Sequence, residues 1–134
     1  MRLRIELFVD DLDATIGFYT EMLGFQVERR TDGYAALRHG RVVLGFGAAS
    51  DLTARDESGP GPAWQGARVN GAGVEIVLEL DDLDDVTTLY EHCRPRMPAI
   101  ERLRLQPWGL HDFRLRDPDG YYLRVTHGDA AAAQ

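Results

Sequence analysis

The chain carries one strand-and-helix pattern twice, with the second copy 71 residues after the first. Residues 3–19 and 74–90 each open with alternating apolar side chains, and Ile5 aligns with Ile76. A duplicated unit buries the same face each time, so the repeat predicts two similar units within one fold. Chance similarity of two capped helices is the alternative. The shared helix starts read Asp10-Asp11-Leu12-Asp13 and Asp81-Asp82-Leu83-Asp84.

The first half of the chain is predicted to form a strand, a helix and three more strands. Residues 2–9 alternate apolar and polar side chains, which is the period of a half-buried strand. Asp10 or Asp11 caps the following helix, because a carboxylate can accept from the free N–H groups of the first turn. Gly24 ends that helix, since glycine readily adopts the backbone conformation that follows a helix. The three further strands are expected at residues 25–30, 34–38 and 41–46.

The second half repeats this order with a different ending. Residues 74–80 alternate as a strand, and Asp82 caps a helix. Arg94-Pro95 ends that helix, because the residue before a proline disfavours the helical region. Residues 97–105 are expected to form a loop that leads into a strand. Residues 107–126 then predict a hairpin, with strands at 111–116 and 121–126 around an Asp-Pro-Asp-Gly turn.

Residues 48–73 are predicted to connect the two units. They are rich in Gly, Ala, Ser, Pro and Asp without a sustained period, and Trp64 is expected to anchor them rather than to contact a ligand. A length of 134 residues suits one domain. The sequence therefore predicts a single domain, residues 1–134, built from units at 1–47 and 74–127, with a frayed tail at 128–134.

Composition argues against several classes of protein. The net charge of −7 disfavours a nucleic-acid partner, which requires a basic surface, and would attract a cationic small molecule. Solubility alone explains that charge equally well. No apolar run approaches the roughly 20 residues of a membrane span, and the start shows no signal-peptide pattern. With Cys93 as the only cysteine, no intrachain disulfide framework is expected, and a cytoplasmic location is the default.

Two segments carry a resemblance that covers nearly the whole chain. They are DLDATIGFYTEMLGF after the first strand and PWGLHDFRLRDPDGYYLRV near the end. With the duplicated strand and helix order, they resemble the vicinal oxygen chelate superfamily of glyoxalase I, extradiol dioxygenases, and fosfomycin- and bleomycin-resistance proteins. The Pro-Trp-Gly run is more like the bleomycin-resistance branch. The resemblance implies an α+β fold in which two tandem βαβββ units form a curved mixed sheet around a cleft, usually in a homodimer.

Metal-dependent members of this superfamily place His, Glu or Gln ligands on the first and last strands of each unit. Arginine stays protonated and cannot donate a lone pair, so of the matching positions here at most Glu75 could ligate a metal. No metal, no cofactor and no catalytic residue are therefore predicted. A hard-ion site rearranged around Glu6, Glu75 and Glu79 is the alternative, and it would lack an imidazole. The matching positions hold Arg4 (with Glu6 nearby), Glu75, Gly45 or Leu44, and Arg124, and the poorly placed histidines are His39, His92, His111 and His127.

Aromatic and charged side chains are predicted to line the cleft instead of metal ligands. By resemblance, Tyr34 and Trp108 supply ring walls and Glu28 a neighbouring acidic group, whereas Arg29 stands where a third aromatic is expected. Two rings can still sandwich a flat ligand, since base-like stacking contributes about 1–3 kcal/mol per contact. The predicted ligand-binding residues are Trp108, Tyr34, Phe8, Arg4, Glu6, Glu28, Glu75, Tyr122 and Arg124.

Structural roles are the alternative for these side chains. Trp108 could simply cover the core. The charged residues could form internal ion pairs, because an unpaired charge in a cleft is unfavourable. The pairs considered are Arg4 with Glu75, and Arg124 with Glu6 or Glu79.

The sequence thus predicts a binding protein rather than a catalyst. It would sequester a planar aromatic small molecule, and Arg29 at the third aromatic position favours an antibiotic other than bleomycin. The alternative is a glyoxalase- or dioxygenase-like lyase or isomerase with an altered metal site. A fold component with an unknown ligand is a third possibility.

Overall fold

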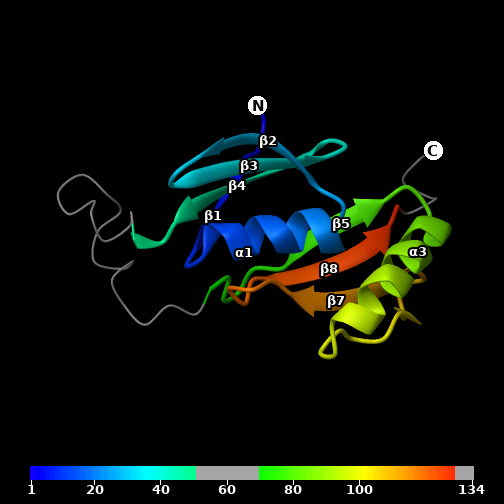
Figure 1. Cartoon of the computed structure of the whole chain (residues 1–134). Helices are drawn as coiled ribbons and strands as arrows, with labels where there is room; N and C mark the ends of the chain where they lie inside the picture. The colour runs from blue at the N-terminus through cyan, green and yellow to red at the C-terminus, as the bar shows by residue number, and fades with distance from the viewer. Residues whose placement is uncertain (51–69, 129–134) are drawn as a thin grey trace. The chain divides into compact units, whose positions relative to one another are not determined.

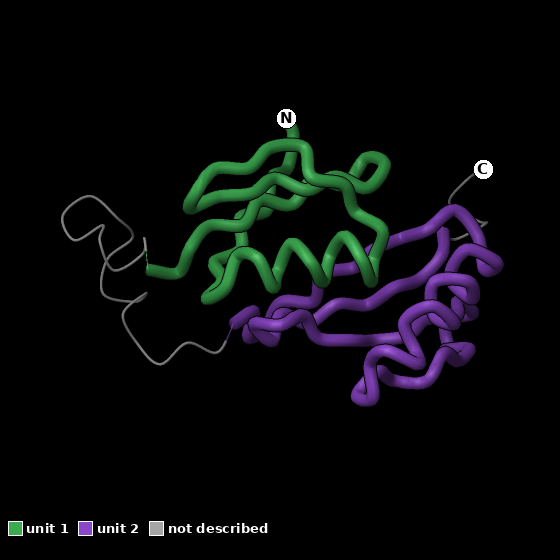
Figure 2. Tube along the Cα trace, viewed as in Figure 1, with its two compact units in different colours: residues 1–69 green, residues 70–134 purple. Residues whose placement is uncertain are grey.

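The protein folds into two compact units, residues 1–69 and 70–134 (Figure 2). The structure, a computed structural model, describes residues 1–50 and 70–128. Most of the predicted connector, Trp64 included, and residues 129–134 of the predicted tail lie outside this range. That both units belong to one domain stays a prediction. None of the helices in the described part is long and apolar enough to cross a membrane.

The first unit is a four-stranded sheet with one helical segment (Figure 1). The strands lie in the order β1-β4-β3-β2, where β1 runs parallel to β4 and the other neighbours are antiparallel. The strand–helix–three-strand order predicted from the sequence is therefore confirmed. The elements are β1 (Ile5–Val9), α1 (Leu12–Gly17), η1 (Phe18–Met22), β2 (Gln26–Thr31), β3 (Tyr34–His39) and β4 (Val42–Ala48).

The helical segment begins and ends as its end residues predict. Asp11 is the N-cap, and its side chain accepts from the Ala14 N–H at 3.0 Å. Gly24 follows the segment with a φ of +75°, a conformation that side chains larger than hydrogen disfavour. The segment differs from the prediction in its second part, because η1 is a π-helix. A stripe of apolar residues predicts a buried helical face, but it does not distinguish an α from a π turn.

The core of the first unit lies between this segment and one face of the sheet. The Tyr19 ring is fully buried and lies 4.7 Å from the Phe46 ring of β4, centroid to centroid. Apolar side chains of β1, β3 and β4 complete this layer. The opposite face of the sheet carries the alternate residues of the same strands. In each unit, we call this face the open face. The buried apolar strand residues are Leu7, Val9, Ala35, Leu37, Leu44 and Phe46.

The second unit has the same topology. Its sheet order is β5-β8-β7-β6, and β5 runs parallel to β8 as β1 does to β4. The registers match as well: Ile5 pairs with Leu44, and Ile76, its counterpart in the repeat, pairs with Leu123. The α+β class with two βαβββ units is thus confirmed. The elements are β5 (Ile76–Leu80), α3 (Leu83–Cys93), η3 (Arg94–Arg96), β6 (Arg104–Leu105), β7 (His111–Arg116) and β8 (Tyr122–His127).

The core of the second unit lies between α3 and its sheet. Val86 and Cys93 of α3 are fully buried, and the Tyr90 ring lies 5.4 Å from the Phe113 ring of β7. These side chains lie on the face of α3 that packs against the sheet. The sheet residues buried beside it are Ile76, Leu78, Phe113, Leu115, Leu123 and Val125.

The strands that begin each unit are shorter than the alternation predicts. The parallel ladders start at Ile5 and Ile76, so residues 2–4 and 74–75 lie outside them. Alternation reports which face of a strand is apolar, but it does not report where the partner strand stops bonding. A second local difference is an irregularity of pairing between Val27 and Arg29 of β2, which leaves Glu28 out of register.

Candidate functional site

Three predicted site residues meet on the open face of the first unit. Arg4 donates from Nη2 to Glu6 Oε1 at 2.6 Å and to the Tyr34 hydroxyl at 3.0 Å. The Tyr34 hydroxyl in turn donates to Glu6 Oε1 at 3.2 Å. The Glu6 carboxylate is the main cause of a raised pKa of Arg4, and the hydrogen bond to the Tyr34 hydroxyl raises it further. These side chains therefore form one polar group that joins β1 to β3 across the intervening strand β4.

Two glycines of β4 make room for this arrangement. Glu6 pairs with Gly45 and Phe8 with Gly47, so the side chains of β1 lie beside bare backbone. A Cβ at Gly45 would collide with the Glu6 carboxylate and the Tyr34 hydroxyl, and one at Gly47 would lie 3.1 Å from the Phe8 ring. Small residues at these two positions thus allow an acidic side chain and an aromatic ring to lie flat on the sheet.

Arg29 and Glu28 occupy different surroundings on β2. The Arg29 guanidinium carbon lies 5.6 Å from the centre of the Tyr34 ring, where it can make a cation–π contact. Glu28 instead accepts from Arg38 Nε at 2.8 Å, and both side chains are exposed. Arg29 therefore contacts the predicted aromatic wall at Tyr34, whereas Glu28 contacts Arg38.

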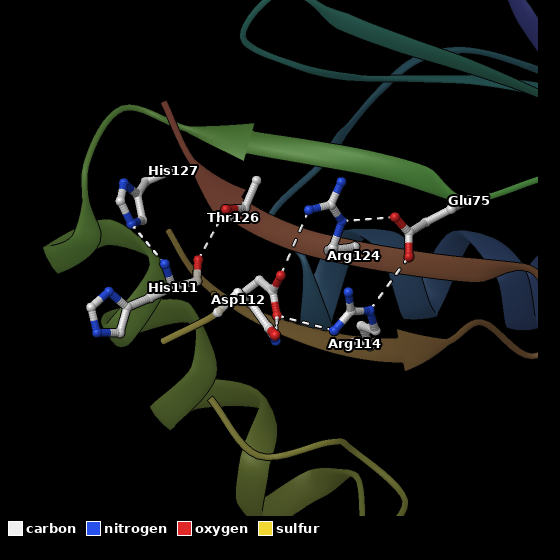
Figure 3. A network of polar contacts seen from close by, with 8 residues as sticks. Glu75, His111, Asp112, Arg114, Arg124, Thr126 and His127 are labelled. Carbon is white, nitrogen blue, oxygen red and sulfur yellow. Dashed lines mark hydrogen bonds and ion pairs between the residues drawn. The ribbon is translucent and has the colours of Figure 1, made fainter. Parts of the chain in front are cut away.

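The second unit carries a four-residue charged network on its open face (Figure 3). Glu75 accepts from Arg124 Nε at 2.7 Å and from Arg114 Nε at 3.4 Å. Arg114 also donates from Nη1 to Asp112 Oδ1 at 3.2 Å. Arg124 Nη1 lies 3.6 Å from Asp112 Oδ2. Two cations and two anions alternate in this network, so each arginine is held by a carboxylate on both sides.

Asp112 is the buried centre of this network. Its side chain is fully buried, and Gln106 Nε2 donates to its Oδ1 at 2.7 Å. Among the described residues, Oδ2 is the one buried side-chain nitrogen or oxygen atom without a hydrogen bond, although Arg124 lies at ion-pair distance from it. Burial by itself lowers the pKa of Arg114, but the charges and hydrogen bonds of Asp112, Tyr122 and Glu75 raise it by more. Arg114 therefore stays a cation in this part-buried position.

Trp108 and Tyr122, two predicted ring residues, each lie beside an arginine. Trp108 is 56% exposed, so more than half of its surface is open to solvent, and that it simply covers the core stays the alternative. The guanidinium carbon of Arg124 lies 6.0 Å from the centre of the Trp108 ring. That of Arg116 lies 5.1 Å from the centre of the Tyr122 ring. Both distances fall within the range of cation–π contacts.

The ion pairs differ from those considered from the sequence. Within their units, Arg4 pairs with Glu6, and Arg124 pairs with Glu75 and Asp112 rather than with Glu79. Each of these pairs forms within one unit. The reason is register: the sheet neighbour of a side chain is set by the strand beside it, and alternation along one strand does not reveal that neighbour.

The predicted site residues fall into separate groups. One comprises Arg4, Glu6 and Tyr34 in the first unit, and another comprises Glu75, Arg124 and Trp108 in the second. That these groups contact one ligand together stays a prediction. In residues 1–50 and 70–128, no three His, Cys, Asp or Glu side chains are grouped to hold a metal ion.

Sequence reasoning missed Asp112, Arg114 and Gln106. Asp112 and Arg114 have opposite charges two residues apart, which places both on one face of a strand. That signal predicts a shared face, but it does not predict full burial of the carboxylate. The contact between Gln106 and Asp112 crosses the turn that carries Trp108, and no periodicity reports it.

Known proteins resemble this chain over most of its length. A family model described as Glyoxalase/Bleomycin resistance protein/Dioxygenase superfamily matches residues 3–125. A bleomycin resistance protein of Geobacillus stearothermophilus is 33% identical over 114 residues, which cover 83% of this chain and 84% of that protein.

Solved structures share the fold. The crystal structure of a bleomycin-binding protein complexed with bleomycin is 27% identical, with a TM-score of 0.65, and the match covers 96% of this chain and 99% of that one. Lactoylglutathione lyase from Agrobacterium tumefaciens is 24% identical, with a TM-score of 0.75, over 96% of this chain and 93% of that one. The lyase shows likeness of fold alone. The chain therefore belongs to the Glyoxalase/Bleomycin resistance protein/Dioxygenase superfamily, in its bleomycin-resistance-like branch.

Proposed function

We propose that this protein binds a planar aromatic, antibiotic-like small molecule and sequesters it without chemical change. The observation that carries the proposal is Trp108, a large ring that is 56% exposed and has a guanidinium beside it. An exposed indole offers a large flat surface on which a ligand ring can stack. Similarity to bleomycin resistance proteins and to a bleomycin-binding structure supports an antibiotic as that partner.

Flat rings suit the open faces better than other ligand shapes. Tyr34 and Phe8 in the first unit and Trp108 in the second present ring surfaces, and stacking on one such ring contributes about 1–3 kcal/mol. Arg29 lies against Tyr34, where the resemblance leads one to expect another aromatic residue. A guanidinium is planar and can stack on a ligand ring as an aromatic side chain does.

Polar groups beside these rings can orient a bound ligand. Glu6 Oε1 already accepts from Arg4 and from Tyr34, and Arg4 itself is largely exposed. A cationic group on a ligand can take the place of the Arg4 guanidinium on this carboxylate with little loss of buried contact. The net charge of −7 favours the approach of such a ligand.

Calorimetric titration tests the proposal, with bleomycin and the planar antibiotic daunorubicin as probes. Trp108→Ala and Tyr34→Ala are each expected to weaken binding about tenfold, the loss of one stacking contact. Phe18→Ala is the matched control, because Phe18 lies in the helical segment and packs edge-on against Tyr19. The proposal fails if the wild-type protein binds no planar compound, or if both alanine variants keep wild-type affinity.

Metal independence is part of the proposal. Glu6 and Glu75 are the acidic side chains nearest to the positions where metal-dependent relatives place ligands. Glu6 is bonded to Arg4, and Glu75 to Arg124 and Arg114. A cation there would have to displace these arginines. Metal analysis of the purified protein is expected to find no stoichiometric transition metal. A divalent ion held by three or more protein donors, with activity that its removal abolishes, would instead favour the lyase or isomerase alternative.

A further inference from the structure

The turn that carries Trp108 is tied to the sheet by its backbone. The Gly109 N–H donates to the Gln106 carbonyl at 2.9 Å, and the Gln106 N–H donates to the Leu110 carbonyl at 2.8 Å. Gly109 has a φ of +91°, which glycine adopts without strain. This tight turn between β6 and β7 fixes where the indole leaves the backbone, but it does not fix the orientation of the ring.

The buried side chain of Gln106 anchors the turn to the interior. Its Nε2 donates to Asp112 Oδ1 at 2.7 Å, and both side chains are buried. Asp112 is itself held in the middle of the sheet, since its backbone pairs with Arg104 of β6 and Thr126 of β8. The start of the turn is therefore fastened to a point that cannot move without disturbing three strands.

Asp112 is also connected to the Trp108 ring through Arg124. Asp112 Oδ2 lies 3.6 Å from Arg124 Nη1, and the Arg124 guanidinium lies 6.0 Å from the centre of the Trp108 ring. Glu75 holds the same guanidinium through Nε at 2.7 Å. One side of the indole is thus occupied by a cation whose place is set from two directions, which leaves the other side for a stacked ligand.

A carboxylate suits this position better than an amide does. Gln106 Nε2 and Arg114 Nη1 donate to Asp112 Oδ1, and Arg124 Nη1 lies at ion-pair distance from Oδ2. A carboxylate accepts at both oxygens, whereas an amide of the same shape would turn an NH₂ group toward one of the donors. Loss of the charge would also leave the two arginines with Glu75 as the remaining acidic partner in this network.

We propose that Asp112 is a positioning residue that sets both the backbone and the ring face of Trp108 for ligand binding. The inference deepens the proposed function, because its value to the protein depends on a ligand that stacks on Trp108. Asp112 would not touch that ligand. It would act through Gln106 on the turn and through Arg124 on the indole, so its replacement should alter Trp108 even when no ligand is present.

Fluorine NMR of Trp108 tests this directly. In a Trp64→Phe background, Trp108 is the only tryptophan and gives a single 5-fluorotryptophan resonance. Asp112→Asn is expected to move or broaden that resonance in the ligand-free protein. Gln106→Met, which removes the anchoring donor at similar volume, should do the same and serves if Asp112→Asn fails to fold. Both variants should bind daunorubicin or bleomycin about tenfold more weakly, as expected for a broken buried charged hydrogen-bond network.

Asp117→Asn is the matched control. Asp117 is another buried carboxylate of the second unit, and its Oδ1 accepts from the Asp119 and Tyr121 N–H groups in the β7–β8 turn. Its replacement should lower stability and leave the Trp108 resonance unchanged. The inference is overturned if Asp112→Asn and Gln106→Met leave the resonance as in the parent, or if Asp117→Asn alters it equally. If the parent binds neither probe, the proposed function fails while the fluorine result still decides the role of Asp112.

Discussion

Gly45 has a role that depends on the absence of a side chain. It lies where β4 passes between Glu6 of β1 and Tyr34 of β3, and a Cβ there would collide with both. The atoms that would be displaced are the ends of two side chains, and these ends can move without disturbing the backbone. A methyl group at Gly45 should therefore change the positions of Glu6 and Tyr34 rather than the stability of the fold.

Gly45→Ala is expected to separate binding from stability. The melting temperature should change little, because the atoms that a Cβ at this buried glycine would displace are the ends of side chains and not backbone. Affinity for a planar probe should fall, because the Glu6 and Tyr34 side chains can no longer lie over β4. Calorimetric titration and thermal unfolding measure the two effects. Gly17→Ala is the control, since a Cβ there meets nothing within 4 Å. Unchanged affinity in Gly45→Ala would contradict the role assigned to this group.

Cys93 is a core residue rather than a reactive thiol. Its side chain is fully buried in α3, and burial raises the thiol pKa from 9.0 to about 11, against a smaller lowering by Arg96. A thiol reacts as its thiolate, so the native protein should react with a disulfide reagent slowly at pH 7.5 and rapidly after unfolding. Complete labelling of the native protein within seconds would contradict this assignment.

The same pKa shift predicts a dependence of stability on pH. The folded thiol has the higher pKa, so the stability it contributes is fully present below pH 9 and is lost as the pH rises through about 11. Urea unfolding at pH 8 and pH 11 should show a larger loss for the wild-type protein than for Cys93→Ala. The variant corrects for tyrosine ionisation, which affects both proteins. Equal losses in the two proteins would exclude a contribution from Cys93.

At the scale of elements, the two helical segments begin in the same way. Asp11 accepts from the Ala14 N–H at 3.0 Å, and Asp82 accepts from the Asp85 N–H at 2.9 Å. Both residues have extended backbone, as N-caps do, and both follow the first strand of their unit. The acidic repeat in the sequence is therefore a repeat of helix starts.

Removal of either cap should lower stability by a similar amount. Asp11→Ala and Asp82→Ala are each expected to reduce the free energy of unfolding by about 1 kcal/mol, because an N–H group of the first turn loses its acceptor. Urea unfolding provides the measurement. Thr88→Ala, an exposed change in the middle of α3, should cost nothing, since alanine is the better helix former. A cap variant as stable as the wild-type protein would show that solvent satisfies that N–H group equally well.

At the scale of the whole molecule, the sheets leave edges that an assembly can cover. Each sheet ends in strands bonded on one side within its own unit: β1 and β2 in the first, β5 and β6 in the second. Apolar side chains are exposed at or beside β1 and β5, among them Leu3, Val74 and Val77. Exposed apolar strand edges favour association with another chain.

A homodimer is the expected assembly. A symmetric pair would cover these edges in both copies at once, which is the common arrangement of soluble oligomers. Sedimentation velocity at micromolar concentration should show a species of twice the 15.0 kDa chain mass. Val77→Arg is expected to shift it toward the monomer, whereas Thr88→Ala should not. A wild-type protein that sediments as a monomer throughout this range would contradict the expectation.

The sequence by itself determined the elements, their order and their apolar faces. Alternation in residues 3–9 and 74–80 predicted the apolar faces: Leu7 and Leu78 are buried, whereas Leu3 and Val74, before the paired part of each strand, are exposed. Asp11, Gly24 and Asp82 marked helix ends correctly because capping depends on contacts within a few residues. These features are local, so a single stretch of chain contains all the information that they require.

Only the tertiary structure decided which side chains meet. Arg114 lies opposite Arg124 because β7 and β8 pair in one particular register, and the same register brings both to the buried Asp112 and to Glu75. Alternation assigns a residue to a face of its strand, but the neighbour across the sheet depends on pairing between distant segments. For this reason Tyr34 and Trp108 could be predicted from the sequence as ring residues of the site, whereas Asp112, which is proposed to hold Trp108 in place, could not.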